Sequence, residues 1–218
     1  AGLGAGIDLA TGAGNSMDIE WALSTDMLPD GMTAYIAYSP KPDGSKSADK
    51  GASGDASSTV TGSGWDFVVR STGLADGLDV FAGWSTIEQA AEGTGTITQG
   101  DRTEYVLGAK YAIGSVTLGY QYTRDNVQES EPTATRYYEN DAFGISFNVN
   151  DDLALSYGQT KSTRAQQGIL ANEAKAESLQ LSYTMGGATI VFAENSVDNA
   201  SYVSASTNDV DGTTIALT

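Results

Sequence analysis

The chain has 218 residues with 28 acidic and 11 basic side chains, and its formal net charge of −17 argues against a nucleic-acid partner, because phosphate binding needs clustered Lys and Arg. Without any cysteine or histidine it can form neither disulfides nor Cys/His zinc sites, and it lacks the side chain most often used for acid–base chemistry near neutral pH. The chain contains no stretch of about 18 apolar residues, the length that would predict a transmembrane helix.

Alternation of apolar and polar side chains recurs along nearly the whole chain and predicts β-strands. In residues 103–111, for example, Tyr105 and Leu107 are apolar, whereas Glu104 and Lys110 are charged. The same two-residue repeat predicts eleven strands, near residues 15–24, 32–39, 63–73, 78–88, 103–113, 115–124, 141–149, 153–162, 176–185, 188–196 and 212–218.

The predicted connections alternate between short and long. Pro, Asp, Asn and Gly favour tight turns in the short ones, at 28–31, 74–77, 113–115, 150–152 and 186–187. The long ones are mostly polar, at 40–62, 89–102, 125–140, 163–175 and 196–211. Tight turns at one rim and long loops at the other are typical of a membrane β-barrel, whereas a soluble Greek key mixes its long connections between both ends.

Aromatic side chains gather near the strand ends on the apolar faces. In a membrane barrel such residues form girdles at the two interfaces, although Tyr favours strands in any sheet. These residues are Tyr38, Trp65, Trp84, Tyr105, Tyr111, Tyr120, Tyr122, Tyr157 and Tyr183. The polar faces fit a water-filled interior and a solvated sandwich equally well. Connection lengths and girdles together favour an all-β, antiparallel transmembrane β-barrel, with residues 1–218 as one domain.

Three segments resemble the Rhodobacter-type general porins, the trimeric porins of alphaproteobacteria. They are 102–126 with its Gly114-Ser115 turn, 186–195 and 211–217. The resemblance implies a closed barrel of sixteen strands in the bacterial outer membrane. It also implies a homotrimer in contact with membrane lipid and lipopolysaccharide.

If these are the last eleven of sixteen strands, residues 1–14 are expected to end the loop that folds inward and narrows the pore, and residues 15–218 to form barrel strands. We then expect five earlier strands to be missing from the sequence. The chain stops at Thr218, whereas members of the family end in an aromatic residue. We therefore expect a few residues to be missing after Thr218 as well.

Strand alternation also predicts which charges face the interior. In the family this chain resembles, acids on the inward loop face basic side chains on the opposite wall. We expect Arg70 and Lys110 to form this basic wall, with Asp18 and Glu20 as an acidic lining. An ordinary solvated strand face is the alternative. The complete predicted lining is Asp18, Glu20, Asp66, Arg70, Asp79, Glu104 and Lys110.

Acidic loop residues supply the other candidate site. Asp125, Glu129 and Glu131 could bind Ca²⁺ through carboxylate oxygens, but no EF-hand spacing is present, so a solvated acidic loop is the alternative. No other cofactor is expected, and no catalytic or nucleotide-binding motif is present.

The sequence therefore predicts a non-enzymatic general diffusion porin, passing small hydrophilic solutes and ions with a weak cation preference. The alternative function is a soluble secreted β-sandwich that acts as an adhesin or binds carbohydrate.

Overall fold

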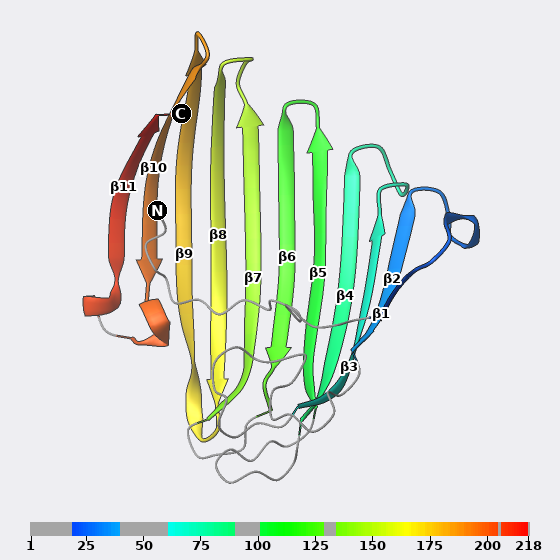
Figure 1. Cartoon of the computed structure of the whole chain (residues 1–218). Helices are drawn as coiled ribbons and strands as arrows, with labels where there is room; N and C mark the ends of the chain where they lie inside the picture. The colour runs from blue at the N-terminus through cyan, green and yellow to red at the C-terminus, as the bar shows by residue number, and fades with distance from the viewer. Residues whose placement is uncertain (1–18, 40–60, 90–100, 129–133, 205, 218) are drawn as a thin grey trace.

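The computed structural model describes residues 19–39, 61–89, 101–128, 134–204 and 206–217. There, eleven strands form one antiparallel sheet in chain order (Figure 1). The strands are β1 (Ile19–Ala22), β2 (Met32–Ser39), β3 (Thr61–Ser71), β4 (Leu78–Gln89), β5 (Arg102–Ile113), β6 (Val116–Asn126), β7 (Thr135–Asn148), β8 (Leu153–Gln166), β9 (Ile169–Met185), β10 (Ala188–Asp198) and β11 (Val210–Leu217). Three 3-10 helices lie between them: η1 (Thr25–Met27), η2 (Ala200–Tyr202) and η3 (Ser206–Asn208).

The predicted all-β antiparallel arrangement is confirmed, and β2 has the predicted bounds. Short turns lie at the upper rim of Figure 1, which we call the turn rim. The opposite rim, at the ends where β2, β4, β6 and β10 stop, is called the loop rim. None of the helices in the described ranges is long and apolar enough to cross a membrane.

The predicted long connection at 163–175 is wrong. β8 continues to Gln166 and β9 begins at Ile169, so only Gln167 and Gly168 join them, with Gly168 at φ 73°. Charged and amide side chains lie on both faces here, and the apolar Ile169 and Leu170 are adjacent, so the alternation that revealed the other strands is lost. β7 likewise begins at Thr135, six residues before its predicted start at 141, for the same reason. The alternation of short and long connections therefore fails at this one point.

One face of the sheet, called the outer face, carries large apolar side chains that stay exposed. Trp21, Leu107 and Leu179 are 60%, 57% and 56% exposed. In the described part of the chain the buried apolar residues are few and mostly small, so no second layer covers this face as it would in a sandwich. A continuous exposed apolar face is a contact surface for lipid or protein.

The boundary between apolar and polar side chains crosses the outer face obliquely. At the loop rim, the apolar stripe ends at Tyr105 on β5 and at Leu179 on β9. The register aligns Tyr105 with Glu173 of β9, six residues before Leu179. Over four strands this is about 1.5 residues per strand, which at about 3.3 Å per residue and 4.8 Å between strands is a tilt of roughly 45°. Membrane barrels have this strand tilt.

Close backbone packing at the turn rim requires glycine at residue 77. Gly77 has φ 77°, and its carbonyl accepts a hydrogen bond from the Ala112 amide at 2.9 Å. A Cβ added at this glycine would lie 2.3 Å from the Ala112 carbonyl oxygen. The turn between β3 and β4 is thereby fixed to the end of β5.

We predict that Gly77→Ala lowers the free energy of unfolding more than Gly114→Ala does. Gly114 also has a positive φ, 56°, but an added Cβ meets nothing within 4 Å. The control should cost about 1 kcal/mol for backbone strain alone, and Gly77→Ala at least about 1 kcal/mol more. Urea unfolding in lipid vesicles measures both, and equal losses would contradict the packing argument.

Candidate functional site

Four carboxylates line up on the polar face of the sheet, which we call the inner wall. Strand register places Glu20, Asp66, Glu104 and Asp125 in one lateral row, passing Ala37 on β2 and Ser85 on β4. We call these four the acidic row. The Ser85 hydroxyl donates a hydrogen bond to Asp66. Carboxylates distant in sequence thus lie abreast because the strands pair in register.

Arg102 holds together the buried end of the acidic row. Glu104 and Asp125 are direct cross-strand partners, 7% and 2% exposed, a like-charge contact that is unfavourable by itself. The Arg102 Nε–H donates to Asp125 Oδ1 at 2.9 Å, a second guanidinium N–H donates to Asp125 Oδ2, and the same nitrogen lies 3.1 Å from Glu104 Oε1. The guanidinium therefore compensates both carboxylates.

A second, more exposed charged group lies nearer the turn rim. The Arg70 Nε–H on β3 donates to Asp79 Oδ1 on β4 at 2.8 Å, and its other arm contacts the second carboxylate oxygen. Lys110 on β5 is the register partner of Asp79. The Arg70 side chain is 56% exposed and Lys110 is exposed. Two bases thus flank one acid, which leaves an excess of positive charge facing open space.

Beside Lys110 the inner wall is recessed. Its row continues through Gly119, Gly144 and Gly158 to Ser178 on β9. A hollow of about 340 Å³ lies over these glycines. No side chain fills it from the glycine positions, so the wall keeps space next to an exposed ammonium group.

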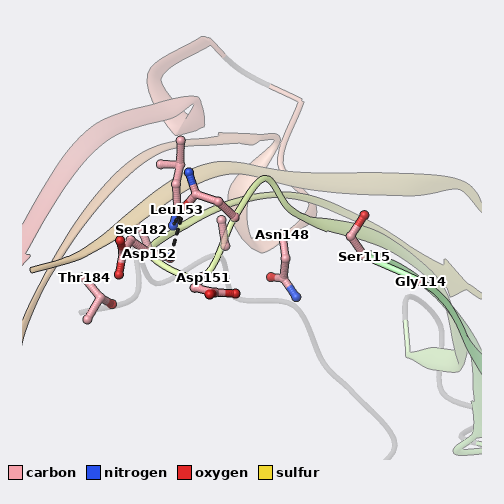
Figure 2. Close-up of a pocket in the computed structure, with 10 residues that line it drawn as sticks. Gly114, Ser115, Asn148, Asp151, Asp152, Leu153, Ser182 and Thr184 are labelled. Atoms are coloured by element: carbon pink, nitrogen blue, oxygen red, sulfur yellow. Dashed lines mark hydrogen bonds between the residues drawn. The ribbon is translucent and has the colours of Figure 1, made fainter.

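A second hollow, of about 580 Å³, opens where this wall meets the turn rim (Figure 2). Asn150 Oδ1 shapes its edge by accepting hydrogen bonds from the backbone amides of Asp152 and Leu153 at 2.9 and 2.8 Å. Ser182 and Thr184 contribute hydroxyl groups from β9. The wall is therefore polar from the charged groups to the turn rim.

Six of the seven predicted lining residues lie on the inner wall, and Asp18 lies outside the described residues. Sequence reasoning missed Arg102, and it placed Asp125 in a loop. If the predicted strand 103–113 began at 102 and the predicted strand 115–124 ended at 125, the two-residue alternation would place Arg102 and Asp125 on the polar face.

Asp125, one of the three predicted calcium ligands, points to Arg102 on this wall. Glu129 and Glu131 fall outside the part of the chain that the structure describes. Within that part no group of three or more acidic side chains is arranged to hold a metal ion. The calcium site stays a prediction.

We predict that Arg102→Ala strongly destabilises the fold, because it leaves two buried carboxylates without their cation. Breaking such a buried pair costs about 3–5 kcal/mol. Arg70→Ala, which removes the same side chain from an exposed pair, should cost little. Urea unfolding in vesicles compares the two, and equal losses would show that the Arg102 network is not a buried one.

The family of Gram-negative porins matches residues 4–216 of the chain. No curated protein sequence matches it. The family match agrees with the exposed apolar outer face, the tilted strands and the polar inner wall, and it confirms the predicted channel function and its location. The chain belongs to the Gram-negative porin family, and is thus a non-enzymatic β-barrel diffusion channel of the bacterial outer membrane.

Proposed function

We propose that the inner wall lines a water-filled channel for small hydrophilic solutes and ions, and that Arg70 and Lys110 supply the basic side of the electrostatic field that a passing ion meets. The observation that carries this proposal is the exposed group of Arg70, Asp79 and Lys110 beside the recessed glycine row. Such a group acts on a passing ion by its charge, without chemistry. The recess supplies the room for a hydrated solute.

Two charged zones then act in sequence along the channel. Asp66 is four residues closer to the loop rim than Arg70 on β3, so the acidic row precedes the basic group for a solute entering at that rim. The more exposed carboxylates of this row, Glu20 and Asp66, raise the local concentration of cations. Together with the net charge of −17, this row favours a weak overall preference for cations.

The outer face supports contact with membrane lipid and lipopolysaccharide. Beyond its apolar stripe, toward the loop rim, it carries ion pairs between Arg124 and Glu139 at 3.0 Å and between Lys175 and Glu177 at 2.7 Å. Charges at this level would meet lipid headgroups and phosphates, while the apolar stripe contacts acyl chains.

The resemblance to Rhodobacter-type porins supplies the remaining parts of the proposal. These are a homotrimer, sixteen strands in the complete barrel, and an inward constriction loop ending in residues 1–14, which lie outside the described ranges. In the described sheet β1 and β11 have one neighbour each, and a membrane barrel needs both edges paired. This supports further strands between them.

Conductance across a planar lipid bilayer tests the channel. We expect ohmic steps that occur in groups of three. Lys110→Glu should raise the ratio of K⁺ to Cl⁻ permeability by about two- to threefold, because it reverses a charge facing the lumen. The reversal potential in a KCl gradient measures this ratio.

Lys161→Glu is the matched control, because Lys161 is exposed on the outer face of β8. It makes the same charge change and should leave the ratio unchanged. Absence of any channel would refute the proposed function, whereas equal shifts in both variants would refute the role of Lys110 alone.

A further inference from the structure

The segment between β10 and β11 folds onto the inner wall instead of simply joining two neighbouring strands. Tyr202 of η2 is 3% exposed. Its ring centroid lies 5.7 Å from that of Tyr138 on β7, and its hydroxyl oxygen lies 2.7 Å from Ser162 Oγ on β8. β7 is three strands from β10, or about 14 Å across the sheet. Tyr202 therefore lies across the inner wall, beyond β9, and contacts β8 and β7.

The contacts of Tyr202 tie it to four strands. Ser162 donates a hydrogen bond to Asn140 Oδ1, and the Asn140 amide donates to Thr123 Oγ1 on β6 at 2.9 Å. On β9, Ala174 has no exposed surface, and this strand contacts η2. The Arg164 guanidinium lies 4.8 Å from the Tyr202 ring centroid. Ser162, Asn140 and Thr123 share one register row of the inner wall.

The backbone of this segment is held in an unfavourable conformation. Asn199, Ser201 and Tyr202 have φ of 53°, 59° and 60°, in the left-handed region that non-glycine residues rarely occupy. Such residues persist only where surrounding contacts hold them. Asn199 supplies two of these contacts, from its side-chain amide to the Glu173 carbonyl at 3.1 Å and from its backbone amide to Asp209 Oδ1 at 2.9 Å.

We propose that residues 199–203, which we call the inner clasp, form a fixed narrowing of the channel near the loop rim, and that Tyr202 determines its width. This rests on the proposed function of the inner wall as a channel lining. The clasp occupies lumen space that a direct β10–β11 turn would leave open, and the Tyr202 ring between Tyr138 and Arg164 holds it there. The largest solute that passes is therefore set in part by this tyrosine.

Single-channel conductance and the size limit for neutral polyethylene glycols test the clasp. Tyr202→Ala should raise the conductance roughly 1.5-fold and admit larger polymers, because the segment loses its anchor. Tyr202→Phe keeps both ring contacts but loses the contact with Ser162, so it should raise the conductance by a smaller factor than Tyr202→Ala. Tyr105→Ala, which truncates an exposed tyrosine on the outer face, should change neither quantity.

Two further variants decide the case if Tyr202→Ala does not insert as a folded barrel. Ser162→Ala removes the hydroxyl partner of Tyr202. Asn199→Ala removes the bond to Glu173 and adds strain, because alanine disfavours the left-handed backbone conformation of this residue. Both should raise conductance by a smaller factor. Unchanged conductance and size limit in folded Tyr202→Ala, or in both of these variants, would overturn the clasp. A parent protein without channels would instead refute the proposed function.

Discussion

The pairing of every strand with its sequence neighbour, from β1 to β11, is the constraint on which the rest of the structure depends. In hydrocarbon an unpaired N–H or C=O group costs several kcal/mol, so every strand must be hydrogen-bonded on both sides. Pairing fixes the register, and the register fixes which side chains lie abreast. The two-residue repeat then sends alternate side chains to lipid and to the lumen. Both the oblique apolar stripe and the acidic row follow from this geometry.

The charged side chains of the inner wall fall into two groups, one buried and one exposed. Where carboxylates are buried, as at Glu104 and Asp125, Arg102 compensates them and the group stabilises the wall. Where charges are exposed, as at Arg70 and Lys110, the pair energy is small and the charge remains available to passing ions. Burial therefore separates the charges that hold the barrel from those that act on solutes. The inner clasp is a third feature of this wall, and the packing around Tyr202 sets the width of the channel there.

Sequence reasoning located strands wherever one face was apolar, and β2 matched residue for residue. It failed at 163–175, because Lys161 and Lys175 on the outer face are as polar as Ser162 and Asn172 on the inner wall, and only cross-strand bonds reveal the strands there. The same parity rule placed six of the predicted lining residues on the inner wall. It could not find the clasp, because the contact of Ser162 with Tyr202 spans 40 residues and depends on how a connection folds.

Thiol accessibility tests the central claim, the assignment of one face to lipid and the other to water, most directly. The chain has no cysteine, so each single substitution supplies the only thiol. In protein reconstituted into vesicles, Gln121→Cys and Ser146→Cys on the inner wall should react with a small water-soluble maleimide. Leu118→Cys and Ile145→Cys on the outer face should react only with a lipid-soluble reagent. Reaction of both sets with the water-soluble reagent, or the reverse pattern, would contradict the account.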